Sequence, residues 1–413
     1  MALRQTPATD LRSQALRLKK MPNALLVLNA GSSTIKLALF ASGGSGDPAL
    51  LCKGMLDHHQ HQPQMVVKDL HGNVLFERHA AAEAGDESFF SDLLHWLDEF
   101  LAGGTLVAVG HRVVHGGLKF FAPVQVTPAI LQALRELTPL APLHQPVCLA
   151  PIEAMQKLRP DLPQVACFDT AFHHSVAPPM SRFALPRHFE QEGVRRYGFH
   201  GLSYEFIARR LREIAPDLAT GRIVTAHLGS GASLCAMRNG RSIDTTMSFT
   251  TLDGLMMGTR CGAIDPGLPL YLQQQRGLSA DEIEYVLYYE SGLLGVSGIS
   301  ADVRVLTTSD DPRAAEALEL FAFRAGAAIA AMTHSLGGLD AIVFTAGIGE
   351  NSPEVRKRIC AGLGWLGVEI DDRANRANEL RIGAKTARVA TLVVPTDEEA
   401  AIAAHSQALI TNR

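Results

Sequence analysis

The sequence of 413 residues lacks several features that mark special classes of protein. No uninterrupted apolar run approaches the ~18 residues that a membrane span needs, so no membrane partner is expected. Basic residues are not in excess, because the formal net charge is −4, and this argues against a nucleic-acid partner. The six cysteines are scattered without CxxC pairs or zinc-like spacing, as is typical of reduced thiols in a cytoplasmic protein.

The N-terminal segment, residues 1–22, is rich in basic residues but lacks the continuous apolar stretch of a secretory signal. We expect it to be a disordered leader, or to reflect a start codon assigned ahead of Met21. An organellar transit peptide is the alternative.

Strand-like and helix-like runs alternate along the rest of the chain, which predicts an α/β fold. The strand candidates are Leu25–Leu28, Ile35–Phe40, Leu106–Val109, Val165–Phe168, Ile223–Ala226 and Ala341–Phe344. The helix candidates are Ser88–Leu101, Tyr204–Ile214, Ala280–Tyr289, Pro312–Leu336 and Pro353–Leu363, the last capped by Asn351 or Ser352. We expect loops with one or two weak strands over 41–87. The "DHHQHQ" run at 57–62 is expected to be a solvated loop rather than a metal site.

Two segments far apart in the sequence share one plan. "LLVLNAGSSTIKLALF" (25–40) and "IVTAHLGSGASLCAMR" (223–238) each contain an apolar strand, a Gly-Ser turn and a second apolar strand. A single hairpin of this kind could be an ordinary surface turn or a phosphate cradle. The repetition favours the cradle and predicts two similar lobes. A third glycine-rich stretch, "AIVFTAGIGENSPEVR" (341–356), has the order strand, loop, helix, which suits an anion or a ribose.

Two arginines stand in glycine-rich, otherwise apolar surroundings, where an unpaired guanidinium group would be costly. They are Arg112 in "GHRVVHGG" and Arg260 in "LMMGTRCGAIDPG". Asp169 ends a strand, and His200 lies between glycines in "YGFHG". Each of these four residues has an ordinary structural alternative, such as a surface charge, a helix cap or a buried imidazole. As a set with three phosphate-type loops, they indicate phosphoryl transfer rather than a hydrolase triad.

The chain resembles the acetate kinase family of the actin-like kinase superfamily from about Leu25 to its C-terminus. The motifs that carry the resemblance are "NAGSSTIK", "HRVVHGG", "LAPLH", "FDTAFH", "YGFHG", "HLGSG", "GLMMGTR", "GLLGVSGISADVR", "FTAGIGEN" and "PTDEE". The resemblance implies a two-lobed actin-like (ribonuclease H-like) duplicated fold with an interdomain catalytic cleft. Residues 23–170 would form the N-terminal lobe, completed by a helix over 399–413. Residues 171–398 would form the nucleotide-binding C-terminal lobe.

The implied reaction is the reversible, Mg-dependent transfer of the ATP γ-phosphoryl group to acetate by a direct in-line route, giving acetyl phosphate and ADP. Mg²⁺, with Mn²⁺ as a substitute, would be held by Asn29 and Glu398. The implied catalytic residues are Asp169, His200, Arg260 and Arg112, and Arg112 would also grip the carboxylate. Val114, Leu143, His144, Phe199 and Thr251 would surround the acetate. The residues that would bind the nucleotide or its phosphates are Ser32, Thr34, Lys36, His227, Leu228, Gly229, Ser230, Gly231, Asp302, Val303, Arg304, Gly347, Ile348, Gly349, Glu350 and Asn351. A homodimer in the cytoplasm is expected.

Several positions depart from the usual family pattern. Ser230 replaces an Asn of the nucleotide loop, Tyr204 replaces a His in "GFHGLSY", and Thr251 replaces a Pro beside the acyl pocket. The charged reacting set is retained. The alternatives left open are a propionate or butyrate kinase and, from another class, a nucleotide-binding protein with reduced catalysis.

Overall fold

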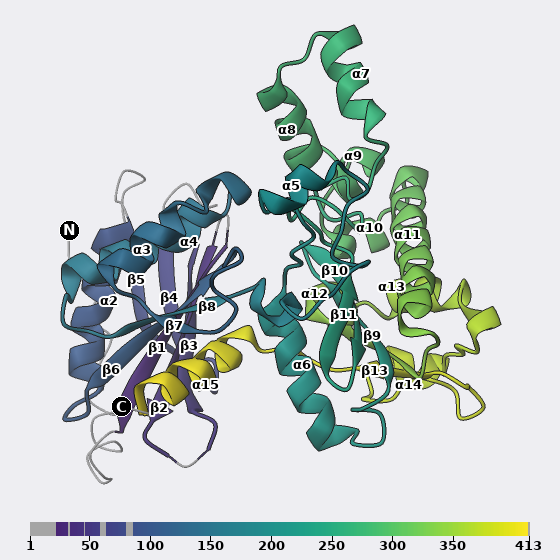
Figure 1. Cartoon of the computed structure of the whole chain (residues 1–413). Coiled ribbons are helices and arrows are strands. Elements are labelled where there is room, and N and C mark those ends of the chain that lie inside the picture. Colours follow the sequence, from purple (N-terminus) through teal and green to yellow (C-terminus); the bar gives the residue numbers. More distant parts are fainter. Residues whose placement is uncertain (1–21, 32–33, 45, 58–62, 80–85, 412–413) are drawn as a thin grey trace. The chain divides into compact units, whose positions relative to one another are not determined.

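The computed structural model describes residues 22–31, 34–44, 46–57, 63–79 and 86–411, and it has the predicted α/β character (Figure 1). The strands are β1 (Asn23–Ala30), β2 (Thr34–Ser42), β3 (Ala49–Asp57), β4 (Gln64–Asp69), β5 (Val74–His79), β6 (Leu106–Val113), β7 (Val124–Gln125), β8 (Gln164–Phe168), β9 (Arg222–Leu228), β10 (Ala232–Arg238), β11 (Arg241–Thr245), β12 (Ala341–Thr345) and β13 (Ala390–Val393). The α-helices are α2 (Asp86–Phe100), α3 (Pro128–Arg135), α4 (Gln145–Leu158), α5 (Arg187–Gln191), α6 (Gly201–Ile214), α7 (Gly267–Arg276), α8 (Ala280–Tyr289), α9 (Gly292–Ser297), α10 (Val303–Thr307), α11 (Pro312–Leu336), α12 (Ala346–Asn351), α13 (Pro353–Ala361), α14 (Asp372–Arg376) and α15 (Glu398–Thr411). Short 3₁₀ turns are η1 (Thr138–Leu140), η2 (Ala171–His173) and η3 (Gly364–Leu366).

The chain forms two compact units. Within the described residues, the first unit draws on 1–111, 150–165 and 403–413, and the second on 112–149 and 166–402. Strands β6 and β8 each begin in the first unit and end in the second. None of the helices in the described parts of the chain is long and apolar enough to cross a membrane.

The first sheet has the strand order β5-β4-β3-β2-β1-β6-β8-β7. Its central strand β1 is buried from Ala24 to Ala30, pairs antiparallel with β2 and pairs parallel with β6. The prediction of loops with one or two weak strands over 41–87 was wrong, because this region contributes three strands, β3, β4 and β5. Strand β5 lies at the sheet edge and has no buried residue, so its sequence carries no strong apolar alternation. In the "DHHQHQ" run, residues 58–62 lie outside the described residues.

The second sheet repeats the connectivity of the first. Its order is β11-β10-β9-β12-β13, which matches β3-β2-β1-β6-β8 strand for strand. Strand β9 pairs antiparallel with β10 and parallel with β12, as β1 does with β2 and β6. The two hairpins seen in the sequence therefore belong to two copies of one sheet plan, and the predicted duplication is confirmed.

Helices cover both faces of the second sheet (Figure 1). Successive side chains of a strand point to opposite faces. Ile223, Cys235 and Val343 pack in one cluster with the apolar side of α6, whereas Val224 and Leu234 pack on the other face with α11 and α13. A strand that is buried on both faces has a continuous run of apolar residues in its sequence. Such strands of this sheet could therefore be predicted from the sequence.

Two predicted helices begin where the sequence signals place them, and one predicted loop is helical. Helix α11 spans the predicted Pro312–Leu336, and Ser352 caps α13 by accepting a hydrogen bond from the Val355 backbone N–H. The helical segment follows β12, where a loop was expected at 346–351. The structure instead has the short helix α12, which begins directly at Ala346 with φ of 65°.

Candidate active site

A buried ion pair joins the ends of two neighbouring strands. Arg112 lies near the end of β6, and Asp169 directly follows β8, the next strand in the sheet. The Nε and Nη2 atoms of Arg112 both donate to Oδ2 of Asp169, at 2.9 and 2.5 Å. The Asp169 side chain is fully buried, and its other oxygen, Oδ1, has no hydrogen-bond partner. A buried carboxylate oxygen without a donor is costly, so this atom is available to a ligand.

The charges around this pair favour an ionised pair at neutral pH. Burial raises the pKa of Asp169 to about 6, with Arg112 opposing that increase and Glu398 adding to it. Burial disfavours the charge on Arg112, but Asp169, Cys148 and Glu398 together outweigh burial, and the pKa of Arg112 is raised. Glu398, at the start of α15, is close enough to both groups to affect their pKa values.

Arg260 is the second cation of the site, and its hydrogen bonds within the described part of the chain include none to a carboxylate. Its Nη2 lies 3.3 Å from Nε2 of His144, its Nη1 donates to the Thr251 carbonyl at 3.2 Å, and its guanidinium carbon lies 5.8 Å from the Tyr288 ring centroid. Burial lowers the pKa of Arg260, and the charge of Arg112 lowers it further. The positive charges of the two neighbouring guanidinium groups repel each other. An anion bound beside both groups would relieve that repulsion.

His200 lies on a strained turn directly before helix α6. Its φ is 58°, in the left-handed region that non-glycine residues rarely adopt. Gly201 follows it, and a Cβ atom there would lie 2.1 Å from the Asp169 carbonyl oxygen, which accepts the Gly201 N–H at 2.8 Å. Only glycine permits this approach, so "FHG" places His200 beside Asp169.

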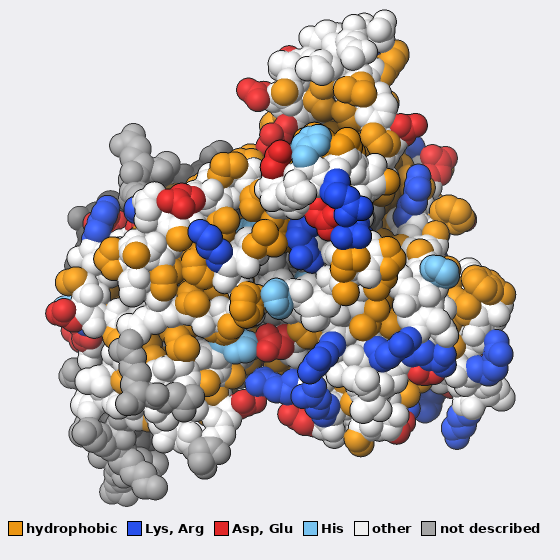
Figure 2. All heavy atoms as spheres, in the orientation of Figure 1, with side chains coloured by type: hydrophobic (Ala, Val, Ile, Leu, Met, Phe, Trp, Pro, Cys, Tyr) orange, Lys and Arg blue, Asp and Glu red, His pale blue; other side chains and the backbone are white. Residues whose placement is uncertain are grey.

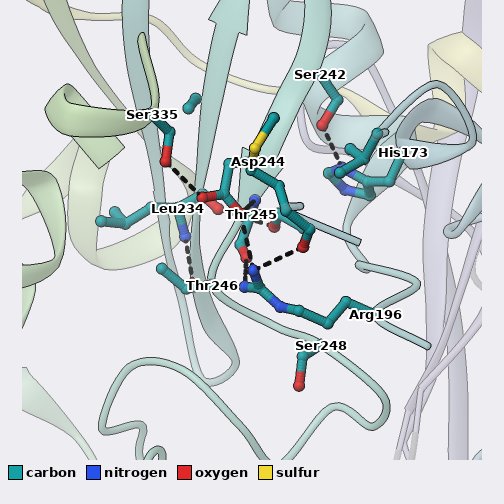
Figure 3. A network of polar contacts seen from close by, with 12 residues as sticks. His173, Arg196, Leu234, Ser242, Asp244, Thr245, Thr246, Ser248 and Ser335 are labelled. Carbon is teal, nitrogen blue, oxygen red and sulfur yellow. Dashed lines mark hydrogen bonds and ion pairs between the residues drawn. The ribbon is translucent and has the colours of Figure 1, made fainter. Parts of the chain in front are cut away.

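A polar network behind the turn holds it in place (Figure 3). His173 contacts the Phe199 carbonyl through Nε2 at 2.9 Å and the Ser242 hydroxyl through Nδ1 at 2.8 Å. Nearby, Arg196 donates to Asp244 at 3.1 Å, and Ser335 of α11 donates to the same carboxylate at 2.7 Å. These contacts tie the segment before His200 to β11 and α11.

The imidazoles of the site are neutral at physiological pH. Burial lowers the pKa of His200 well below its ordinary value, and His227, Arg112 and Arg260 lower it further. Burial, Arg260 and Arg112 together lower the pKa of His144 to about 3. These rings therefore act as hydrogen-bond donors or acceptors and add no net charge.

The predicted nucleotide loop between β9 and β10 lies against this cluster. The rings of His227 and His200 stack with centroids 4.2 Å apart. A methyl group on Gly231 would lie 3.3 Å from Nε2 of His200 and 3.8 Å from Nη1 of Arg260. Leu228 is buried, whereas Ser230 is exposed and accepts the Gly258 N–H through its carbonyl at 3.2 Å. The loop backbone thus faces the same space as the cations.

The other predicted nucleotide-binding residues of the second unit cap helices, form hydrogen bonds within the protein or are buried. Asp302 caps α10 and pairs with the exposed Arg304, and Val303 is buried. Oε1 of Glu350 accepts the backbone N–H groups of Ala346 and Thr396, at 2.7 and 3.1 Å. Three further members of the set, Gly347, Ile348 and Asn351, lie on α12, where Asn351 donates to the Gly347 carbonyl at 2.9 Å, and Gly349 is buried there.

The predicted acetate wall combines apolar and polar groups of one unit. Val114 and Phe199 are buried in the same apolar cluster, and Thr251 is buried next to Arg260. Leu143 is half-buried and precedes His144. Within the second unit, Thr251 and His144 contact Arg260, and both arginines lie in electrostatic range of His144 and His200.

Three of the predicted residues lie in the first unit, on the β1–β2 hairpin. Asn29 is buried on β1 and faces Lys36 of β2 in the strand register, and Lys36 is exposed. Thr34 begins β2 and accepts the Gly31 N–H through its carbonyl at 2.8 Å. Ser32 lies outside the described residues. Across the described parts of the chain, no group of three or more His, Cys, Asp or Glu side chains is placed to hold a metal ion.

Sequence reasoning missed two residues that contact the site. Ser233 of β10 lies 2.8 Å from Nδ1 of His200, and Tyr288 of α8 lies beneath Arg260. A buried hydroxyl in an otherwise apolar strand is a signal that could have revealed Ser233. Nothing in the sequence around Tyr288 distinguishes it from its neighbours Tyr285 and Tyr289.

Comparisons with known proteins show the family of the chain. The model of the acetokinase family matches residues 24–404. An acetate kinase of Rhodopseudomonas palustris is 50% identical over 391 residues, covering 93% of this chain and 98% of that protein. An acetate kinase of Methylocella silvestris is 48% identical over 399 residues, covering 94% and 98%.

Solved structures with the same fold include two short-chain carboxylate kinases. A propionate kinase from Francisella tularensis is 35% identical with a TM-score of 0.86, covering 93% of this chain and 98% of that chain. The acetate kinase of Porphyromonas gingivalis is 34% identical with a TM-score of 0.83, covering 94% and 100%.

The duplicated sheets and the related kinases show that the chain is a phosphotransferase of the actin-like fold class, as predicted. Its acceptor is a carboxyl group. The chain belongs to the acetokinase family, and the resemblance stated from its motifs is confirmed.

Proposed function

We propose that this enzyme transfers the γ-phosphoryl group of ATP reversibly to acetate, giving acetyl phosphate and ADP. The observation that carries the proposal is the cluster of two guanidinium groups, Arg112 and Arg260, with neutral imidazoles, in which Arg260 makes no hydrogen bond to a carboxylate of the described residues. Family membership supports the same assignment.

The two reactants are both anionic, so the protein's main tasks are charge neutralisation and alignment. In the transfer, a carboxylate oxygen forms a bond to the γ-phosphorus as the bond from that phosphorus to the β,γ-bridging oxygen breaks. No proton needs to move. Arg112, held by Asp169, grips the carboxylate, and Arg260 and His200 stabilise the charge on the transferring group.

The apolar wall selects a short acyl chain. Val114 and Phe199 are fully buried, and Thr251 closes the wall with a small side chain. One methylene changes binding by only about 1–3 kcal/mol, so propionate is a second substrate. The structural neighbour described as a propionate kinase has the same fold, which favours testing propionate directly.

The hard oxygen ligands that Mg²⁺ prefers are present in the proposed set. The unpartnered Oδ1 of Asp169 and the nearby charge of Glu398 make a carboxylate-rich environment that suits a divalent cation. We assign Asn29 and Glu398 as the residues that hold it, with Mn²⁺ as a substitute. When bound, the ion would neutralise charge on the ATP phosphates. Lys36, Ser32 and Thr34 would meet phosphate oxygens, and the loop at 227–231 and the segments at 302–304 and 347–351 would hold the nucleotide.

A hydroxamate assay tests this proposal. Active, folded protein incubated with Mg-ATP, hydroxylamine and an acid is expected to yield acetohydroxamate, with kcat/KM highest for acetate, lower for propionate and lower still for butyrate. The same mixture with excess EDTA is expected to yield none. A butyrate maximum would reassign the acyl preference. Tight ATP binding without hydroxamate from any of the acids would instead indicate a nucleotide-binding protein with reduced catalysis.

A homodimer is the assembly that we propose, and the helices α7 and α8 support it. In α7 no residue is buried, and Leu270, Tyr271 and Tyr285 are each half exposed or more. Hydrophobic side chains are visible over this part of the surface (Figure 2). Large exposed apolar patches mark interaction sites.

The double variant Leu270→Glu with Tyr271→Glu is expected to sediment as a monomer, because two buried charges would oppose association. Analytical ultracentrifugation of the wild type and the variant makes the comparison. The matched control is Phe323→Glu, which adds a charge at an exposed apolar residue of α11 and is expected to leave the dimer intact. A wild type that sediments as a monomer would contradict the assembly.

The proposed cytoplasmic location is supported by the state of the cysteine thiols. Within the described residues no disulfide is formed by Cys52, Cys148, Cys167, Cys235, Cys261 or Cys360. Cysteines without disulfides are typical of a reducing compartment.

A further inference from the structure

A chain of three hydrogen-bonding groups runs behind His200. The Tyr204 hydroxyl lies 2.5 Å from Oγ of Ser233, and the same Oγ lies 2.8 Å from Nδ1 of His200. Tyr204 and Ser233 are fully buried, on α6 and β10 respectively. Because these groups are shielded from water, each hydroxyl proton must be donated within the chain.

The hydrogen-bond partners fix the direction of this chain. Among the described residues, the Tyr204 hydroxyl has one hydrogen-bond partner, Oγ of Ser233. The phenol proton must therefore be donated to Ser233. The Ser233 hydroxyl, which accepts from Tyr204, then donates to Nδ1 of His200. The reverse direction would leave a buried phenol proton without an acceptor, which is costly.

The free nitrogen of His200 faces the site. If Nδ1 accepts a hydrogen bond, the proton of the neutral ring is on Nε2. Nε2 lies on the same side of Gly231 as Nη1 of Arg260, because a methyl group on Gly231 would approach both atoms. In the other tautomer, a lone pair on Nε2 would face the same space and repel phosphoryl oxygens.

We propose that Tyr204 is a positioning residue that acts through Ser233 to hold His200 in the tautomer protonated on Nε2, as a donor to the transferring phosphoryl group. The inference rests on the proposed function of the site.

The direct test is ¹⁵N NMR of histidine-labelled wild-type protein, with the His200 signals assigned by comparison with His200→Gln. His200 is expected to show a protonated Nε2 and an unprotonated Nδ1. The opposite pattern would overturn the inference. This readout does not depend on activity, so it is separable from failure of the proposed reaction, which would appear as wild-type enzyme that forms no hydroxamate.

Kinetics of Tyr204→Phe provide the second readout. The ring keeps its packing against His173 and His227, and only the hydroxyl is lost. We expect kcat to fall by roughly 3- to 10-fold with KM for acetate and ATP unchanged, the scale of one hydrogen bond. Ser233→Ala is expected to give a similar loss, and the double variant no more than the larger single loss, because both act through one chain.

The matched control is Tyr197→Phe. It removes another buried phenol, which donates to the Gly193 carbonyl at 2.7 Å and has no contact with His200. Its kcat is expected to match the wild type. An unchanged kcat in Tyr204→Phe, or losses that add fully in the double variant, would contradict the role of the chain.

Discussion

Replacement of Arg260 by Ala is expected to lower kcat for acetyl phosphate formation by about 10²–10³-fold, the scale for the loss of one preorganised electrostatic group. Arg260 is oriented by His144, the Thr251 carbonyl and the Tyr288 ring, and within the described residues it makes no hydrogen bond to a carboxylate. Its charge is therefore available to the transferring phosphoryl group. Steady-state rates with saturating acetate and Mg-ATP measure the effect.

Arg210→Ala is the matched control for this variant. Arg210 lies on the surface of α6 and pairs with Glu213, away from the cluster, and surface ion pairs contribute little. Its kcat is expected to equal that of the wild type. If Arg260→Ala also kept near wild-type turnover with an intact fold, the role assigned to Arg260 would be wrong.

Replacement of Asp169 by Asn is expected to have the second large effect, lowering kcat/KM for acetate by about 10²-fold or more. Asp169 orients Arg112 through two hydrogen bonds to one oxygen, and an amide in its place supplies no charge to hold the guanidinium group. The wild-type pH profile provides an independent readout. The pKa of Asp169 is raised to about 6, so the carboxylate is ionised above that pH and is protonated as the pH falls through it.

The wild type is therefore expected to lose kcat/KM on the acid side of about pH 6, and Asp169→Asn is expected to lack that acid limb. The same limb in the variant would show that another group titrates. The effect on stability has the opposite sign. The folded state binds this proton more tightly than the unfolded chain, so the contribution of Asp169 to the free energy of unfolding decreases as the pH rises toward 6.

The sequence predicted the parts of the fold whose signals are local. Strands buried on both faces, such as β9 and β12, are continuous apolar runs, and α11 begins with Asp311 and Pro312 as helix starts do. One or two weak strands were expected over 41–87, whereas three are present, because β5 is an edge strand with no buried residue and β4 is only partly buried. Their stability comes from pairing with neighbours, which no local pattern records.

The site was predicted as a set of residues but not as a geometry. Arg112 and Asp169 are 57 positions apart, and their contact depends on β6 and β8 being neighbours in the sheet. The turn that places His200 depends on the glycines of "YGFHG", which the sequence shows. The sequence does not show that the Asp169 carbonyl is the group that Gly201 approaches closely. Ser233 was missed because its role depends on contacts with His200 and Tyr204, about 30 positions away in the sequence.

The central claim is that Arg112, Arg260 and His200 converge on the reacting anion. A crystal structure of the enzyme with acetyl phosphate tests it most directly. The account predicts that phosphoryl oxygens lie within hydrogen-bond distance of the Arg260 guanidinium group and of Nε2 of His200, with the acetyl oxygen at Arg112. A phosphoryl group bound out of reach of all three side chains would contradict it.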